Sequence, residues 1–577
     1  MKIFNNTVSL HKFVNKILIL FIFIFLTCMF TYPAVFHIEN KVIGSGYDNY
    51  QMLGWQYLAK TRVDTGKSVF GWTNYWRYPV GIDFSTSFDS IALISLGLYL
   101  YIFTSNPVVV FNFSILLLIF FSCILSFLYF KKISGTNTLG ILGSIIYSFS
   151  FFVLVRVGGH INFLLVGCFP FLAYALIKLL EEQNRKSIFI TAVATILVFV
   201  ASLQYFLILI GSLILLVPLS YIFFKENFYS IIKILLKNRY FSLFCALLIL
   251  FTFYLFFAND IHAIFDGNMY VQPLYSTKVF SARFTDYLWP NEDLPLLIKP
   301  PFYLPVLEGW NDRTVFLGYA EIFIFVLFIF SKVNIKTKMF ILSGTLLLYI
   351  LSLGCKNIYY PYCYIYHLYP YQGITEASRF YVVIYFLFVT GIVLLIKSLN
   401  NKIRLPVLAI VFILVVLERL PSNFYLSDTY ADSAFIKTVQ VQNSKAVLDL
   451  PVVVSIAGKS QGEYDLFSVY YQKPIVNGYI QRRGDTTESN SFVNYLNVFE
   501  CGTGKTLGMQ EGLEISETLK KFGIITIVFH KQPDIYVEDE PMFCDQAMNN
   551  IYYFVNESGV MLNKLFEDDQ TIVFQIM

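Results

Sequence analysis

Long apolar runs separated by short polar connections dominate the pattern of hydrophobic and polar positions along this chain. A helix needs about 20 apolar residues to cross the hydrocarbon core of a bilayer. Segments that approach this length lie at 17–36, 107–130, 139–155, 162–180, 187–203, 206–224, 241–258, 315–330, 339–353, 381–396 and 405–417. The pattern predicts an α-helical polytopic membrane protein with about 11 transmembrane helices.

The charge of the polar connections predicts how the chain is oriented. Basic residues gather in alternate connections, at 131–132, between 225 and 239, and between 397 and 404. Because loops rich in Lys and Arg stay in the cytoplasm, we expect the N-terminus inside and segment 37–105 outside. The opening run is about twenty residues long and no small-residue cleavage site follows it, which favours an uncleaved helix over a signal peptide. The protein is therefore expected in the cytoplasmic (inner) membrane.

Two regions depart from the alternation of spans and loops. Outer loop one, 37–105, carries apolar residues at helical spacing near 50–57 and a short apolar stretch at 90–103, and both predict helices that lie in the membrane interface. From about residue 425 the charges return and no spanning run follows, whereas KAVLDLPVVV (445–454) and GIITIVFH (523–530) resemble strands. We therefore expect a transmembrane domain at 1–424 and a C-terminal extracytoplasmic α/β domain at 425–577.

Composition narrows the class of protein further. The chain is 56% hydrophobic and only 14% charged, and its 60 Phe and 41 Tyr suit wide aromatic belts at both membrane interfaces. A net charge of +4 without a basic cluster excludes a nucleic-acid partner. Cys355 and Cys363 share one outer loop, and Cys501 and Cys544 share the terminal domain, so two disulfides are possible on the oxidising side.

The segment KVIGSGYDNYQ (41–51), which follows the first span, carries the leading candidate for chemistry, Asp48. An acidic residue beside a membrane is costly unless it is solvated, paired or used. Its carboxylate could accept a proton from an acceptor hydroxyl or hold a divalent metal. The alternative is a solvated N-cap of the interfacial helix.

Four further residues face the same side by this topology. Asp83 lies in YPVGID (78–83), His160 lies in RVGGHIN (156–162) together with Arg156, and Arg379 begins a span. Histidine can donate to a phosphate, bind metal or transfer a proton, and the arginines can bind phosphate oxygens. The alternatives are a cap for Asp83, a loop histidine in water, and cations at the headgroup rim.

The chain resembles the GT-C superfamily of integral membrane glycosyltransferases, and within it the YfhO-like group of bacterial membrane proteins. The segments that carry the resemblance are GYDNYQMLGW (46–55), YPVGID (78–83), GGHINFLLVGCFPFLAYAL (158–176), FLGYAE (316–321), EASRF (376–380), VLDLP (447–451), KPIVNGYIQR (473–482) and KFGIITIVFH (521–530). The resemblance implies sugar transfer from a polyprenyl-phosphate donor, with Asp48 as base or metal-associated residue. No Asp-x-Asp or Glu-x-Asp accompanies His160, so it stays open whether a divalent cation, Mg²⁺ or Mn²⁺, binds at Asp48 and His160.

These observations favour a glycosyltransferase that acts on the outer face of the cytoplasmic membrane. Its partners would be the lipid bilayer, a polyprenyl-phosphate sugar donor, and a glycan, lipid or protein acceptor. The binding residues would be Asp83, Arg156, His160 and Arg379. A transporter or flippase is the alternative, although the spans carry few ionisable residues at their centres, where a transport path usually has them. A protein that assembles or binds envelope components is the third hypothesis.

Overall fold

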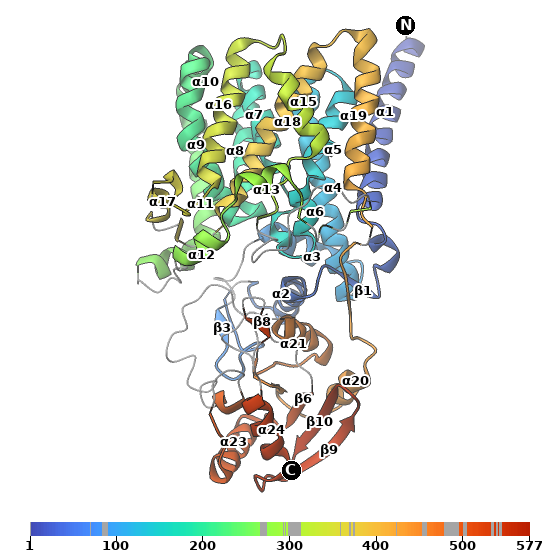
Figure 1. Cartoon of the computed structure of the whole chain (residues 1–577), viewed down its shortest axis with the longest axis vertical. Helices are drawn as coiled ribbons and strands as arrows, with labels where there is room; N and C mark the ends of the chain where they lie inside the picture. Colours follow the sequence, from blue (N-terminus) through green and yellow to red (C-terminus); the bar gives the residue numbers. More distant parts are fainter. Residues whose placement is uncertain are drawn as a thin grey trace.

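The computed structural model has a helical bundle at one end and a smaller part containing a β-sheet at the other (Figure 1). It describes residues 2–69, 71–83, 90–265, 274–291, 294, 296–297, 313–357, 359–368, 371–372, 376–422, 424–452, 459–477, 496–499, 505–531, 536–537, 540–541 and 545–577. The N-terminus and α10 lie at the far end of the bundle, and the C-terminus lies at the opposite end of the molecule.

Each predicted span coincides with one or two helices. The bundle contains α1 (Lys2–Phe30), α4 (Pro107–Ser134), α5 (Asn137–Ser148), α6 (Phe151–Arg156), α7 (Cys168–Glu182), α8 (Arg185–Ala201), α9 (Leu203–Phe223), α10 (Lys225–Lys237), α11 (Arg239–Phe265), α15 (Tyr319–Ile329), α16 (Ile335–Ser352), α18 (Tyr381–Ser398) and α19 (Asn401–Arg419). Among the described residues, 6 helices are long and apolar enough to cross a membrane. The chain is thus a multi-pass membrane protein, while the number of about 11 spans stays a prediction.

Helix α4 illustrates how the sequence sets the ends of a span. Asn106 is its N-cap and accepts from the backbone N–H groups of Val108 and Val109, and Pro107 occupies the first turn. The helix ends at Gly135, which adopts a left-handed conformation. Its 28 residues span roughly 40 Å, enough to cross a bilayer completely.

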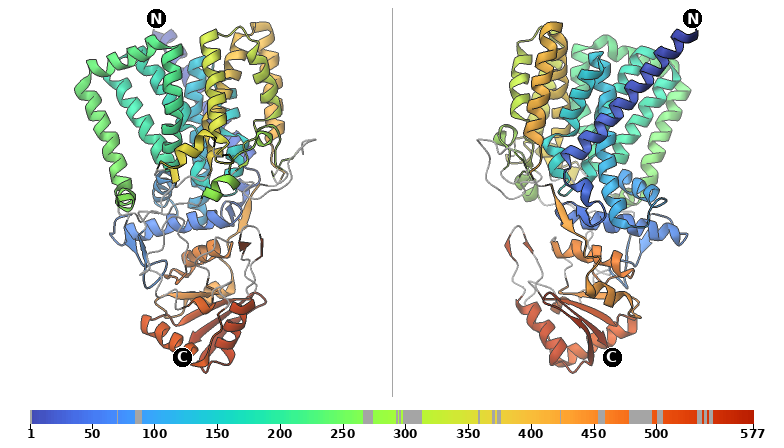
Figure 2. Two further views of the ribbon diagram at one scale, coloured as in Figure 1. Left: turned by 60° about the vertical axis from the view of Figure 1, so that its left-hand side comes forward. Right: turned by 90° about the vertical axis from the view of Figure 1, so that its right-hand side faces the viewer.

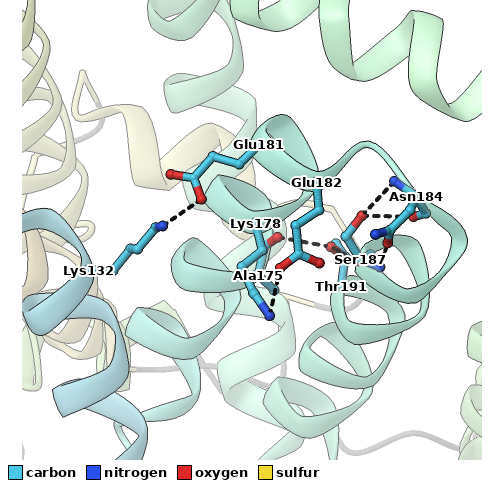
Figure 3. A network of polar contacts seen from close by, with 8 residues as sticks. All are labelled: Lys132, Ala175, Lys178, Glu181, Glu182, Asn184, Ser187 and Thr191. Carbon is cyan, nitrogen blue, oxygen red and sulfur yellow. Dashed lines mark hydrogen bonds and ion pairs between the residues drawn. The ribbon is translucent and has the colours of Figure 1, made fainter. Parts of the chain in front are cut away.

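Polar contacts connect α4, α7 and α8 where α4 and α7 end and α8 begins (Figure 3). Lys132 of α4 lies 2.5 Å from Glu181 of α7, and Lys178 lies 3.0 Å from Glu182. A capping box between Asn184 and Ser187 then starts α8, and Thr191 of α8 donates to the backbone of Ala175. The positive connection at 131–132 is therefore partly neutralised by the acidic end of α7.

Outer loop one forms a layer between the bundle and the sheet-containing part (Figures 1 and 2). It contains η1 (Ala34–His37), β1 (Lys41–Ile43), α2 (Tyr47–Asp64), the hairpin of β2 (Trp72–Thr73) and β3 (Ile82–Asp83), and α3 (Ile91–Leu100). The prediction of a helix near 50–57 is correct, but its surroundings differ from those expected. Residues 49–56 are all buried, because α3 and α4 pack on α2 from one side and α21 packs from the other.

The C-terminal residues form a mixed four-stranded sheet with helices around it. The strand order is β5 (Val447–Leu450), β6 (Thr526–His530), β10 (Thr571–Ile576) and β9 (Leu562–Glu567). β5 and β6 are parallel, and the other two pairs are antiparallel. The helices are α20 (Ala434–Gln440), α21 (Lys459–Tyr471), α23 (Met509–Phe522) and α24 (Asp545–Asn556). Leu448, Ile527 and Phe574 contribute to the apolar core of this part.

The later loops contribute shorter elements at the end of the bundle that faces the sheet (Figure 1). They are α12 (Leu274–Val279), α13 (Phe284–Leu288), α17 (Pro361–Tyr366) and η5 (Ala377–Phe380). Cys355 and Cys363 form a disulfide with their Cα atoms 5.0 Å apart. The possible partners Cys501 and Cys544 lie outside the described residues.

A buried ion pair joins three helices where α5 ends. Glu321 of α15 and Arg419 of α19 lie 2.6 Å apart, and both side chains are fully buried. Arg419 also donates to the backbone carbonyl of Phe149, which follows α5, and to the hydroxyl of Tyr385 in α18. The guanidinium thus satisfies a carbonyl that is left without an intrahelical partner at the end of α5.

Replacement of Glu321 by Gln should destabilise the protein strongly, because it removes a counter-charge from a buried guanidinium. We expect a loss of about 3 kcal/mol, at the lower end of the range for broken buried pairs since Glu418 also faces Arg419. Thermal unfolding of the purified protein in detergent measures the change. Glu181→Gln is the control, because it removes one half of the exposed ion pair with Lys132, and it should change stability by less than about 1 kcal/mol. Equal losses in the two variants would contradict this account.

Candidate active site

Asp48 lies in the first turn of α2, directly after β1 and a turn rich in glycine. Gly44 and Gly46 have φ angles of 130° and 98°, which residues with a Cβ rarely adopt. Gly46 occupies the N-cap position, so Asp48 is the second residue of the helix and not its cap. A carboxylate in this turn is favoured by the positive end of the helix dipole.

His160 meets Asp48 from a different part of the chain. Helix α6 ends at Arg156, and the loop that follows contains Gly158 and Gly159 before His160, whose φ angle is 50°. Its Nδ1 atom lies 2.8 Å from Oδ2 of Asp48. The two side chains are 26% and 23% exposed, so a ligand could reach the pair. The structure thus brings together two of the residues selected from the sequence.

The two loops are joined through their backbones as well. The N–H group of Ser45 donates to the carbonyl of Gly158 over 2.9 Å, and the Ser45 hydroxyl donates to the same oxygen. A Cβ at Gly158 would lie 3.2 Å from the ring of Tyr425, so a side chain there would require this ring to move slightly. The turn before Asp48 and the turn before His160 therefore form one unit.

The strand that leads into the C-terminal part is the third segment of the site. β4 (Leu426–Asp428) pairs antiparallel with β1. Ser427 donates to the carbonyl of Gly44, and the hydroxyl of Tyr50 in α2 donates to the carbonyl of Asp428 over 2.7 Å. Burial, and next the charge of Glu463, raises the pKa of Tyr50 well above its usual value, so this hydroxyl stays a donor.

Asn112 of α4 fixes the same turn from inside the bundle. Its Oδ1 atom accepts from the N–H group of Ile43 over 2.9 Å, and its Nδ2 atom donates to the carbonyls of Ile38 and Lys41. Reasoning from the sequence assigned no role to this residue. A polar amide within an apolar span is itself a signal, because such groups require partners there.

Arg156 and Arg379 are buried in the bundle and stack on aromatic rings. Arg156 lies 4.7 Å from the ring centre of Phe152, and Arg379 lies 4.6 Å from that of Phe163. The two rings are themselves in edge contact at 6.4 Å. The positive charges of both guanidiniums also interact with the hydroxyl of Tyr205 in α9. The two arginines therefore lie close together, below the surface and not at an exposed rim.

Arg379 has polar partners in the described residues. Its Nη1 atom lies 3.0 Å from the carboxylate of Glu376 and donates to the side chain of Gln204. Asp83 ends β3, where its backbone pairs with Trp72, and its side chain lies outside the described part. The structure thus leaves Asp83 as a prediction.

A second group of cations surrounds the disulfide loop. Arg313 forms a buried ion pair with Asp286 at 3.2 Å. Lys356 donates to the carbonyl of Ala282, and burial together with the charges of Arg313 and Arg283 lowers the pKa of Lys356 to about 8. These residues form an electropositive corner in the loops after α11.

The residues at Asp48 do not make up a full set of metal ligands. Within the described ranges, no three His, Cys, Asp or Glu side chains gather in a way that could hold a cation. Asp48 and His160 supply one carboxylate and one imidazole, whereas Mg²⁺ prefers several oxygen ligands. A cation at these two residues therefore stays a prediction.

Comparison with known proteins identifies the fold. No protein-family model matches the sequence, and no curated protein matches it. Arabinofuranosyltransferase AftD from Mycobacteria is similar in structure over 97% of this chain, with 11% identity and a TM-score of 0.53. Two other similar structures are the oligosaccharyltransferase AglB from Archaeoglobus fulgidus and ArnT from Cupriavidus metallidurans bound to undecaprenyl phosphate. The match to AglB has 10% identity and a TM-score of 0.46, and it covers 89% of this chain and 69% of the AglB chain. The match to ArnT has 7% identity and a TM-score of 0.40, and it covers 98% of each of the two chains.

The match to AftD shows a shared fold. The chain spans only 39% of the length of AftD. The chain therefore has the fold of this arabinofuranosyltransferase, which agrees with the GT-C resemblance at the level of the fold, whereas the YfhO-like group stays a prediction. The scores of AglB and ArnT are too low to add to this conclusion.

Replacement of Gly44 by Ala should disrupt the turn before Asp48. A Cβ at this position would lie 2.1 Å from the side chain of Asn49, and the φ angle of 130° is itself unfavourable for alanine. We expect a loss of about 1–3 kcal/mol, measured by thermal unfolding in detergent.

Gly159→Ala is the matched control for this substitution. No atom lies within 4 Å of a Cβ built at Gly159, and the φ angle of Gly159 lies outside the left-handed region. The control should unfold at the temperature of the unmodified protein. Equal losses in the two variants would contradict the description of the turn.

Proposed function

We propose that this protein is a membrane glycosyltransferase of the GT-C type, near the YfhO-like group. It would move a sugar from a polyprenyl-phosphate donor to a glycan, lipid or protein acceptor of the cell envelope. The observation that carries the proposal is the contact between Asp48 and His160, at the end of a bundle that shares the fold of an arabinofuranosyltransferase.

Asp48 is the base in this proposal. Its carboxylate accepts the proton of an acceptor hydroxyl while the acceptor oxygen attacks the anomeric carbon of the donor sugar. The bond between that carbon and the phosphate oxygen breaks, and its electron pair leaves with the polyprenyl phosphate. His160 holds the carboxylate in one orientation through the 2.8 Å contact. The products are the glycosylated acceptor and the polyprenyl phosphate.

The phosphate requires positive charge because it becomes more negative as the bond breaks. Arg156 and Arg379 are the candidates, since both guanidiniums are buried and close together on Phe152 and Phe163. The isoprenoid chain would lie between apolar helices of the bundle. Asp83 is kept as a candidate for binding the sugar or the acceptor.

The arrangement also supports the proposed location. Outer loop one and the C-terminal part lie at the end of the molecule opposite the N-terminus (Figure 1). With the N-terminus in the cytoplasm, both would lie on the outer face of the cytoplasmic membrane. Residues 425–577 would then be an extracytoplasmic α/β domain above the site.

Replacement of Asp48 by Asn should abolish transfer without unfolding the protein, because the amide cannot accept the proton. We expect release of sugar from a synthetic polyprenyl-phosphate sugar to fall by at least about 100-fold. The purified protein is assayed with and without added Mg²⁺ or Mn²⁺, which also tests the predicted cation.

Asp64→Asn is the matched control, since this exposed carboxylate lies on the same helix and pairs with Lys60. It should keep full activity. Undiminished activity of Asp48→Asn would remove Asp48 from catalysis. Movement of the intact donor across proteoliposomes, without sugar release by any variant, would instead favour the flippase.

A further inference from the structure

Asn49, the residue that follows Asp48, connects the two loops of the site through its side chain. The carboxamide is fully buried, and its Nδ2 atom donates to the carbonyl of Ile43 over 3.0 Å and to that of Val157 over 3.2 Å. Both partners are carbonyl oxygens, so the NH₂ group must be the one that faces them. One side chain thus bonds to the turn before α2 and to the loop that carries His160.

The first of these partners is itself held from the bundle. Ile43 donates its N–H group to Asn112 of α4 and offers its carbonyl to Asn49. A continuous set of hydrogen bonds therefore runs from α4 through Ile43 and Asn49 to Val157. It joins a transmembrane helix to the loop of His160.

The loop of His160 needs such support from outside. It contains two successive glycines, which give the backbone many alternative conformations. His160 itself adopts a left-handed conformation, which costs a residue with a side chain about 1 kcal/mol. The described side-chain contacts that tie this loop to the turn before α2 and to its first helical turn come from Ser45, Asp48 and Asn49.

The Oδ1 atom of Asn49 supports a specific role over simple packing. It is buried, and no described residue donates a hydrogen bond to it. An unsatisfied amide oxygen costs about 1–3 kcal/mol, so a residue selected for stability alone would be apolar or fully bonded. The two N–H bonds to carbonyls of different loops explain why an amide is present here.

We propose that Asn49 is a positioning residue of the site, which holds the His160 loop against the first turn of α2 so that His160 meets Asp48. The expected effect of Asn49 on sugar transfer rests on the proposed function. The position of the loop, which the carboxamide of Asn49 sets, does not depend on the reaction.

Hydrogen exchange of the full-length protein in nanodiscs tests whether Asn49 holds the loop of His160. In Asn49→Ala, amides of residues 157–164 should exchange about fivefold faster, the factor expected from one lost hydrogen bond of about 1 kcal/mol. Asn112→Ala is the matched control, because it removes a buried asparagine that contacts 38–43 but not the His160 loop. It should accelerate exchange at 38–46. Because it acts on 157–164 only through Ile43 and Asn49, it should change exchange there less than Asn49→Ala does.

Two results would overturn the proposal. One is an unchanged exchange rate at 157–164 in Asn49→Ala, and the other is an equal acceleration there in Asn112→Ala, which would indicate general loosening. If Asn49→Ala does not fold, Asn49→Ser takes its place, since its hydroxyl can still donate one bond. Where both fold, the serine variant should exchange at an intermediate rate.

Kinetics separate this inference from the proposed function. If the protein transfers sugar, Asn49→Ala should lower kcat about fivefold and leave the KM for the donor unchanged, with partial rescue in Asn49→Ser. A raised KM with unchanged kcat would contradict a role in positioning. If the unmodified protein releases no sugar, the proposed function fails, while hydrogen exchange still decides whether Asn49 holds the loop.

Discussion

The structure depends on satisfying the backbone of residues 38–46, a short segment around β1 at the end of a membrane bundle. Buried N–H and C=O groups must find partners, and a segment this short cannot supply them itself. Asn112 of α4 bonds to three of these groups. β4 and the loop at Gly158 bond to others. Asp48 lies directly after this segment, so its position follows from how the segment is held.

This constraint explains why the site is built from segments far apart in the sequence. Lys41 of β1 pairs with Asp428 of β4, and Ser45 bonds to Gly158. Helix α2 then continues between the bundle and α21, which covers it from the other side. The part of the chain that contains the sheet is thus joined to the candidate site by a strand pair and a helix.

The sequence predicted the helical bundle, and it selected Asp48 and His160 as candidates, for identifiable reasons. The length of the apolar runs indicated the spans, and the positions of Asp48 and His160 in successive outer loops followed from the topology. The pairing of β1 with β4 was not predictable, because three-residue strands carry almost no periodicity. The burial of Arg379 was missed because Gln204 comes from α9, far away in the sequence, although Glu376 lies only three residues before the arginine.

Locating a donor in the protein tests the proposed role of Asp48 most directly. The measurement is a cryo-EM structure of the full-length chain in nanodiscs with a phosphonate analogue of a polyprenyl-phosphate sugar, which cannot be transferred. We predict density for the sugar in contact with the carboxylate of Asp48, and for the phosphonate beside Arg156 or Arg379. Sugar density at a different place, with Asp48 and His160 contacting only each other, would contradict the account.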